Sequence, residues 1–194
     1  MSGQPDDDKE LVANAQAGNV DAFGILYERH APAVYRYLYA HLPDFMDAED
    51  LTGEVFLKTW EALPGYRHRG LPFLAFLYRV AHNTLIDHVR RSRQRDHQTM
   101  ADLEEVLQDA NPGPADLVGT RLEHRELLQI MSKLQEDYQT VLILRFLSEL
   151  SPEETAMVMQ RSPGSIRVLQ HRALAALREL MSTRKAGLIY ENYP

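Results

Sequence analysis

The chain has 194 residues, of which 44% are hydrophobic and 25% are charged, and its formal net charge is -7. This size and balance suit one larger or two small globular domains and exclude a disordered tail protein. The sequence contains no cysteine, which excludes a disulfide framework, a thiol redox switch and a thiolate zinc site.

The N-terminus, MSGQPDDDKE, is acidic where a secretory signal peptide would be basic and then apolar. In the C-terminal half the longest apolar run is VLIL at 141–144, which is far too short to cross a bilayer. We therefore expect a cytoplasmic protein with no membrane insertion.

Helical periodicity starts near residue 20. Asp21 is suited to cap a helix that runs to about His41 and ends at Pro43. A second helix is expected from Asp47, in DAEDLTGEVFLKTWEAL. One face of this helix is apolar, with Leu51, Val55, Phe56 and Trp60, and another carries Asp50, Glu54 and Lys58 at i, i+4 and i+8. The apolar face predicts core packing, and the charged face is available to a partner.

After the loop PGYRHRGLP, a third helix is expected to begin at Pro72. Arg79, Asn83, Asp87 and Arg90 form a polar stripe along it. From Arg79 to Arg95, five arginines accompany Asp87 as the single carboxylate. The segment therefore forms a local basic patch in an acidic chain. For binding a polyanion, this local charge matters more than the net charge of the chain.

Residues 96–120 have the composition of an acidic linker, with six carboxylates, no Lys or Arg, and an NPGP sequence that cannot continue a helix. The predicted domains are 1–95 and 121–182, and 183–194 form a tail of unknown role. Helices are expected near 121–132, 137–147, 152–159 and 164–181. No stretch reads as a strand, so the predicted fold class is all-α.

The last two helices carry matching start signals. Ser151-Pro152-Glu153-Glu154 is a capping box with proline at the first helical position, and Ser162-Pro163 repeats the start after a short turn. This pair predicts a helix-turn-helix in which Ala156 and Met159 pack on Ile166, Leu169 and Ala173. The residues left free to meet base edges and phosphates are Ser165, Arg167, Val168, His171 and Arg172. A plain helical hairpin with solvated arginines remains the alternative.

These segments resemble bacterial RNA polymerase sigma factors of the extracytoplasmic-function (ECF) group, within the sigma-70 family. VLILRFLSELSPEETAMVMQRSPGSIRVLQHRALAALREL is similar to the C-terminal promoter-binding domain of the group. DAEDLTGEVFLKTW and LPFLAFLYRVAHNTLIDHVRR are similar to its N-terminal domain. The similar blocks cover roughly residues 20–95 and 122–182, in the order of the family, which is more specific than a helix-turn-helix alone.

The resemblance implies a transcription initiation subunit that binds the beta and beta-prime subunits of core RNA polymerase and promoter DNA. The C-terminal domain would recognise the minus-thirty-five element, and the N-terminal domain would melt the minus-ten element. An anti-sigma factor is an implied partner, for a stress or envelope-signal regulon. No cofactor, metal site or catalytic residue is expected.

The resemblance also assigns residues to each contact. The helix from Asp47 would dock on a coiled coil of the beta-prime subunit, through Asp47, Asp50, Leu51, Glu54 and Lys58. The minus-ten strand would be held by cations and by a pocket for an extruded base, formed by Tyr66, Arg67, Arg69, Arg79, Asn83, Asp87, Arg90 and Arg91. The minus-thirty-five contacts would come from Ser165, Arg167, Val168, His171 and Arg172, with the two arginines foremost.

Two plainer interpretations stay open for individual segments. The charged face with Glu54 and Lys58 could be a solvated surface whose i,i+4 pair contributes a few tenths of a kcal/mol. Gly53 stands where the family often has glutamine, and glycine costs about 1 kcal/mol in a helix interior. The acidic linker either enters the polymerase cleft, as in the family, or is only a solvated connection.

The sequence has no Gly-rich phosphate loop with lysine, no H-E-x-x-H and no G-x-S-x-G, so we expect no enzyme. The main alternative function is an ordinary helix-turn-helix regulator that binds operator DNA without polymerase. A third hypothesis is a polymerase-binding adaptor, which leaves the arginines of the last helix unexplained.

Overall fold

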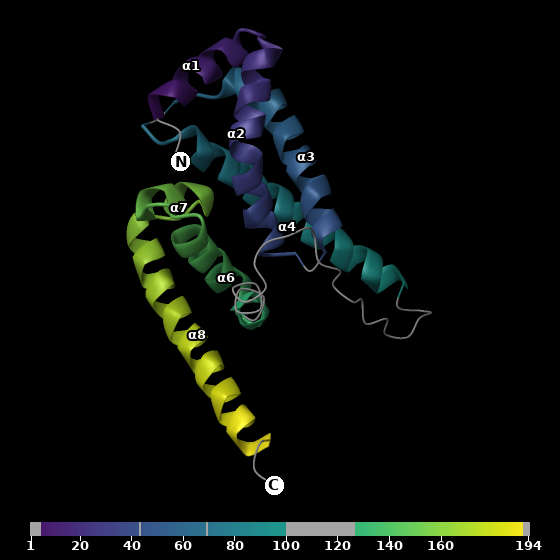
Figure 1. The fold of residues 1–194 in the computed structure, drawn as a ribbon, viewed down its shortest axis with the longest axis vertical. Helices are drawn as coiled ribbons and strands as arrows, with labels where there is room; N and C mark the ends of the chain where they lie inside the picture. Colours follow the sequence, from purple (N-terminus) through teal and green to yellow (C-terminus); the bar gives the residue numbers. More distant parts are fainter. Residues whose placement is uncertain (1–4, 43, 69, 100–126, 192–194) are drawn as a thin grey trace. The chain divides into compact units, whose positions relative to one another are not determined.

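The computed structural model describes residues 5–42, 44–68, 70–99 and 127–191, and side chains at 8–42, 44–68, 70–94 and 127–183. Within these ranges every regular element is helical (Figure 1). The prediction of an all-α fold is confirmed. The chain divides into two compact units, Met1–Pro112 and Gly113–Pro194.

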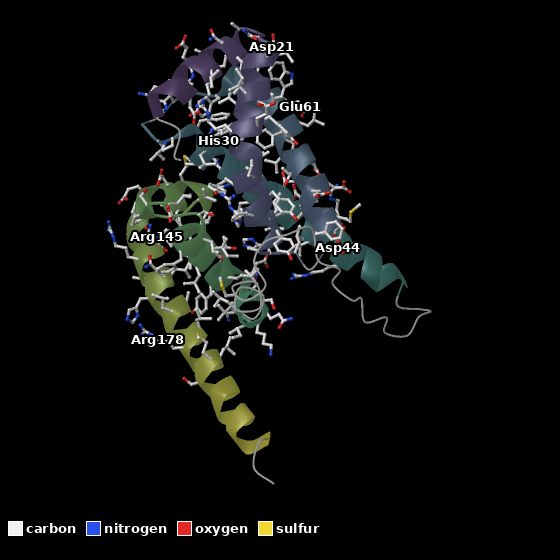
Figure 2. All side chains as sticks on the ribbon, viewed as in Figure 1. Asp21, His30, Asp44, Glu61, Arg145 and Arg178 are labelled. Carbon is white, nitrogen blue, oxygen red and sulfur yellow. The ribbon has the colours of Figure 1, made fainter. Side chains whose placement is uncertain are left out.

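The N-terminal unit is built around one central helix. Its elements are α1 (Pro5–Gln16), α2 (Val20–Tyr39), α3 (Phe45–Ala62), the 3₁₀ turn η1 (Leu63–Gly65) and α4 (Phe73–Thr99). Helix α2 packs against α1, α3 and α4, and α3 also packs against α4. Asp21 and Glu61 lie at one end of this unit and Asp44 lies at the other, so α2 and α3 run antiparallel (Figure 2).

Two helices begin earlier in the chain than predicted. Helix α2 is capped by Asn19, whose side chain accepts a hydrogen bond from the amide of Ala22 at 3.1 Å. Helix α3 is capped by Asp44, which accepts from the amide of Met46 at 2.8 Å. The predicted start residues, Asp21 and Asp47, lie in the first turns, where a carboxylate favours the helix dipole. Asn and Asp are both strong N-caps, so the choice between close neighbours depends on backbone geometry.

The core of this unit is apolar and aromatic. Leu26, Val34 and Leu38 of α2 are completely buried, as is Val55 of α3. Aromatic rings meet edge to face between the helices, with centroids 5.4 Å apart for Tyr37 and Tyr78 and 4.7 Å apart for Tyr27 and Phe56. Such pairs add about 0.5–1.5 kcal/mol each to the burial of their surfaces, so they fix α2 against its neighbours.

Gly53 is exposed in the middle of α3, and a Cβ placed there meets no atom within 4 Å. We therefore expect Gly53→Ala to raise the free energy of unfolding of the N-terminal unit by about 0.5–1 kcal/mol, since alanine loses less backbone entropy in a helix. Urea unfolding followed by circular dichroism measures this change. An unchanged or lower stability contradicts the prediction.

His41, just beyond α2, is held in its neutral form. Its Nδ1 donates a hydrogen bond to the carbonyl of Tyr37 at 2.8 Å, and the two rings have centroids 4.6 Å apart. Burial lowers the pKa of His41 to about 4, against the opposing effect of that hydrogen bond, and His82 contributes to the lowering. The hydroxyl of Tyr37 also forms a hydrogen bond with Nδ1 of His82, at 3.0 Å.

We expect the N-terminal unit to lose stability as the pH falls from 6.5 towards about 4. The folded pKa of His41 lies below the unfolded value, so the unfolded chain binds more protons in this window and acid favours unfolding. In this pH window the unfolding free energy of the His41→Gln variant should fall by about 1–2 kcal/mol less than that of the wild type. This figure is smaller than the full pKa shift implies, because the His41 ring is half-buried. Urea unfolding at several pH values tests this, with exposed His68→Gln as the control. Identical pH profiles for wild type and His41→Gln contradict it.

The C-terminal unit has one long helix with shorter helices packed on it. Its elements are a helical segment at 127–131, α6 (Glu136–Leu142), the π-helical turn η2 (Ile143–Leu147), α7 (Pro152–Val158) and α8 (Pro163–Glu191). Helix α8 packs against both α6 and α7 (Figure 1). The core contains Val141, Ile143 and Leu144 with Val158 and Ile166, all completely buried.

Several predicted boundaries differ from the structure. Helix α4 continues to Thr99, past the expected domain end at 95, and the rest of the predicted linker lies outside the described residues. The expected helix at 137–147 changes to a π-helical turn at Ile143. Helix α8 extends to Glu191, so the boundary drawn at 182 lies within one helix. Among the described residues, no helix is long and apolar enough for a membrane span.

Candidate nucleic-acid interface

Helices α7 and α8 form the predicted helix-turn-helix. The capping box is present, since the hydroxyl of Ser151 accepts from the amide of Glu154 at 3.1 Å and the Glu154 carboxylate accepts from the amide of Ser151 at 2.6 Å. The Ser162 hydroxyl accepts from the amide of Ser165 at 3.2 Å at the start of α8. Between the helices, Gln160 has a φ of 54°, a left-handed conformation that reverses the chain.

The two helices pack through the residues that the sequence indicated. Ala156, Met159, Ile166 and Ala173 are buried, and Leu169 is half-buried. All five predicted contact residues of α8 are exposed, namely Ser165, Arg167, Val168, His171 and Arg172. The start of α8 therefore presents an exposed face with two arginines, a serine, a histidine and one apolar side chain, Val168.

Arg145 joins the segments beneath this face. Its Nε donates to the side-chain oxygen of Gln170 on α8 at 3.0 Å, and its Nη1 donates to the carbonyl of Leu150. Arg161 in the turn forms a second link, 2.6 Å from the Asp137 carboxylate on α6. A guanidinium can hold several acceptors in fixed directions, so Arg145 links α8 to the segment before α7 (Figure 2).

Arg167 has an intramolecular partner. Its guanidinium lies 3.2 Å from the Glu153 carboxylate, and the two side chains are 64% and 53% exposed. A pair this exposed contributes between about 0 and 1 kcal/mol, so it orients Arg167 but yields readily to a phosphate or a base.

In the N-terminal unit, Tyr66 is the aromatic residue of the predicted minus-ten loop. Its ring packs on Phe73 and Phe76, with centroids 5.6 Å and 4.7 Å away. Burial raises the pKa of Tyr66, and the charge of Asp8 adds to the rise, so the phenol stays neutral. Arg67 next to it is exposed, and Arg69 lies outside the described residues.

The polar stripe of α4 is present as predicted from the helical period. Arg79, Asn83, Arg90 and Arg91 are exposed along this helix. Asp87 is half-buried and accepts from Nη2 of Arg90 at 3.0 Å, while its backbone carbonyl accepts from Nε of Arg91 at 3.3 Å. Asp87 therefore orients two cations instead of facing a polyanion alone.

The charged face of α3 is connected to this stripe. Glu54 lies 2.8 Å from Nζ of Lys58 and 3.5 Å from Arg91 of α4. The hydrogen bond from Lys58 is the main cause that lowers the pKa of Glu54, against the effect of burial, and Arg91 contributes. The sequence did not reveal this link, because only the packing of α3 on α4 brings Glu54 and Arg91 together.

The remaining residues of the predicted polymerase-binding set occupy different surroundings. Asp50 is exposed, and Asp47 lies 3.8 Å from Nε2 of His88. Leu51 is only 4% exposed, so in this structure it belongs to the core and not to the exposed face. The correction follows from the helical period, because Leu51 shares the inward face with Val55.

A helix that the sequence analysis did not predict borders the minus-ten loop. A groove of about 510 Å³ lies between α1 and the segment from Tyr66 to Phe73, and Asp8, Val12 and Gln16 are among its lining residues. Asp8, 8% exposed, lies 2.7 Å from Arg29 and 2.9 Å from His30, both on α2. The acidic segment around residues 5–8 shows too weak an apolar period to signal a helix.

Within the described residues, these observations define an all-helical protein that contains a helix-turn-helix and two groups of exposed arginines, one at the start of α8 and one along α4. The Sigma-70 region 2 family matches residues 26–95, and the Sigma-70, region 4 family matches residues 124–177. The chain belongs to the ECF RNA polymerase sigma factors of the sigma-70 family. All predicted DNA-contact residues fall within the two matched ranges, whereas α1 precedes them.

Curated relatives support this membership. The ECF RNA polymerase sigma factor BldN of Streptomyces coelicolor is 38% identical over 172 residues, which are 89% of this chain and 65% of BldN. The ECF RNA polymerase sigma factor SigD of Mycobacterium tuberculosis is 39% identical over 179 residues, which are 87% of this chain and 81% of SigD. The chain thus spans just under two thirds of BldN and most of SigD.

Solved structures are similar as well. CnrH in complex with the cytosolic domain of CnrY has a TM-score of 0.68 at 25% identity, covering 91% of this chain and 98% of that chain. The sigma factor RpoE in complex with the anti-sigma factor NepR, from Bartonella quintana, has a TM-score of 0.65 at 21% identity, covering 82% and 96%. Because RpoE is 21% identical to this chain, its similarity shows a shared fold alone.

Proposed function

We propose that this chain is the promoter-recognition subunit of a cytoplasmic RNA polymerase holoenzyme and carries out no chemistry of its own. The observation that supports this most is the pairing, in one chain, of exposed arginines on a helix-turn-helix with a stripe of exposed arginines along α4, whose first turn packs on half-buried Tyr66. The first suits duplex DNA and the second suits an opened strand. Both are needed to place polymerase at a start site.

The minus-thirty-five contacts are proposed for the N-terminal half of α8. Arg167 and Arg172 are exposed and have the fork geometry that recognises guanine or clamps a phosphate. Ser165 and His171 add hydrogen-bonding groups, and exposed Val168 offers an apolar contact of the kind that a thymine methyl takes. Glu153 holds Arg167 over this face before DNA arrives.

The minus-ten contacts are proposed for the loop after η1 and for α4. The neutral ring of Tyr66 supplies a planar surface for an unpaired base, with Arg67 beside it for the backbone. Arg79, Arg90 and Arg91 supply cations along the path of the strand, and Asn83 supplies both a donor and an acceptor. Arg69 belongs to this set by its place in the sequence.

The polymerase contact is proposed for the charged face of α3, with Asp47, Asp50, Glu54 and Lys58. Leu51 supports this face from the core, given its burial. Arg91 lies within ion-pair distance of Glu54, so the polymerase-binding and DNA-binding sets share a charge network. The acidic segment at 96–120 is proposed as the connection between the two domains inside the polymerase.

An anti-sigma protein is the proposed negative regulator. RpoE of Bartonella quintana, which shares the fold, is in a complex with the anti-sigma factor NepR. This chain exposes apolar side chains on both units, including Leu57 at 60% and Phe146 at 56%. A partner that covers Leu57 would lie on α3, the helix that carries the proposed polymerase contacts, and would compete with polymerase there.

Run-off transcription on a genomic fragment library tests the function. Purified protein and core polymerase from its host are combined or used separately, and DNA binding by the protein alone is measured in parallel. We expect transcripts from a shared promoter motif only when both components are present. Specific DNA binding without polymerase, together with an inactive mixture, overturns the proposal in favour of an ordinary regulator.

A further inference from the structure

The last residue of α1 is hydrogen-bonded to the start of the minus-ten loop. Nε2 of Gln16 lies 2.9 Å from the carbonyl oxygen of Leu63 and 2.8 Å from that of Tyr66. These acceptors are 47 and 50 residues further along the chain. A glutamine amide nitrogen carries two hydrogens, and a carbonyl can only accept, so Gln16 commits both hydrogens to this one turn.

The turn held by Gln16 carries the residues proposed to meet the opened strand. The amide of Tyr66 donates to the carbonyl of Leu63 at 3.0 Å, so that oxygen accepts from the turn itself and from Gln16. The Tyr66 ring is fixed separately by Phe73 and Phe76. Gln16 therefore holds the backbone of Tyr66 while the aromatic residues hold its ring, and the exposed Arg67 follows directly.

Two glycines border the loop. It begins after Gly65, and Gly70 near its other end has a φ of 79°, a conformation that favours glycine. A groove of about 510 Å³ separates the loop from α1, so continuous side-chain packing does not hold the two together there. The hydrogen bonds from Gln16 therefore attach the loop to α1 beside this groove.

Helix α1 is itself firmly anchored. Asp8, one of its buried residues, binds Arg29 at 2.7 Å and lies 2.9 Å from His30. Val12 and Ala15 are buried on the same helix. Gln16 therefore extends from a helix that is packed and ion-paired on α2, so its hydrogen bonds to the loop are in place before DNA binds.

We propose that Gln16 is a positioning residue for minus-ten recognition. Its amide keeps the turn at 63–66 in the conformation that presents Tyr66 and Arg67 to the strand. Without it, the loop must be ordered when DNA binds, and a less ordered loop discriminates less well between bases. The inference rests on the proposed promoter recognition and extends it to α1, which lies outside the matched region 2 range.

The test uses two substitutions and two matched controls on the same helix. Gln16→Ala removes the side chain, and Gln16→Glu keeps its size but replaces the donor by an acceptor. Asn14 is exposed two residues earlier, so Asn14→Ala and Asn14→Asp repeat the loss of an amide and the gain of a negative charge. Each full-length variant is assembled with core polymerase, and open-complex formation is measured on a promoter series with single substitutions across the minus-ten element.

We expect both Gln16 variants to reduce discrimination between the best and the substituted minus-ten elements by about threefold to tenfold, the ratio that corresponds to losing one or two net hydrogen bonds. Affinity for core polymerase and the response to minus-thirty-five substitutions should stay at the wild-type level. The Asn14 variants should match wild type in all three measurements.

The outcomes separate this inference from the proposed function. Wild-type discrimination in both Gln16 variants overturns the positioning role while leaving promoter recognition intact. Wild-type behaviour of Gln16→Glu with a defect only in Gln16→Ala also overturns it, because side-chain packing and not donation would then matter. A wild-type holoenzyme that forms no open complex on any promoter overturns the proposed function instead.

Discussion

Replacing Arg167 with alanine is expected to lower open-complex formation at promoters with a minus-thirty-five element by about fivefold to about 150-fold. This range corresponds to the about 1–3 kcal/mol that an arginine contact to a guanine contributes. Arg167 is exposed at the start of α8, and its only ion pair among the described residues is the weak one with Glu153. Little intramolecular stability is lost with the side chain, so the defect should lie in DNA recognition.

The measurement that checks this compares promoters with and without single substitutions in the minus-thirty-five element, at two or more salt concentrations. If Arg167 reads a base, Arg167→Ala should abolish the preference at one position. If it binds a phosphate, all promoters should weaken equally and the salt dependence should become shallower. Arg178→Ala is the control, since Arg178 is also exposed on α8 but lies several turns further on (Figure 2). Equal activity of the Arg167 and Arg178 variants contradicts the prediction.

Replacing Asp8 with asparagine is expected to lower the free energy of unfolding of the N-terminal unit by about 2–3 kcal/mol. The substitution keeps the shape but removes the charge that holds Arg29 at 2.7 Å and His30 at 2.9 Å. His30 is 7% exposed and Asp8 is 8% exposed, so water replaces the lost partner poorly. Urea unfolding of the full chain, followed by helical circular dichroism, measures the loss.

The same network gives Asp8 a signature in acid. Burial alone would raise its pKa, but hydrogen bonds and charges from His30 and Arg29 outweigh burial and lower the pKa below 3.8. Its contribution is therefore complete above the unfolded pKa and is lost as the pH falls through the lower folded pKa. Asp8→Asn should flatten this acid-dependent loss, whereas Glu28→Gln, an exposed carboxylate on α2, should not. An Asp8 variant as stable as the Glu28 variant contradicts the role of the network.

The helix-turn-helix was predictable because its signals are local. Ser151 and Glu154 are three residues apart, so their capping box can be read directly from the sequence and is confirmed in the structure. Ser162 likewise caps α8 as predicted. The helical period then places Ile166 and Ala173 inward, and it leaves the five predicted contact residues exposed.

Other features depended on residues far apart in the chain. Helix α1 has a weak apolar period, and its place in the fold depends on buried Val12 and Ala15 and on Asp8, which meets Arg29 and His30 on another helix. The left-handed turn at Gln160 could not be predicted from a residue type that rarely adopts it. For the proposed site, the sequence named Tyr66 and Arg67 but not Gln16, which reaches their loop across 47 and 50 residues.

The sequence by itself determined the all-α fold class, the helix-turn-helix and the family, because caps, helical periods and motif spacing act within a few residues. Only the tertiary structure decided that Glu54 and Arg91 are linked and that Gln16 of α1 is hydrogen-bonded to the start of the minus-ten loop. The physical reason is that an ion pair or a hydrogen bond forms wherever packed helices bring two groups within reach. The pattern of residues in the sequence does not indicate which distant residue will be the partner.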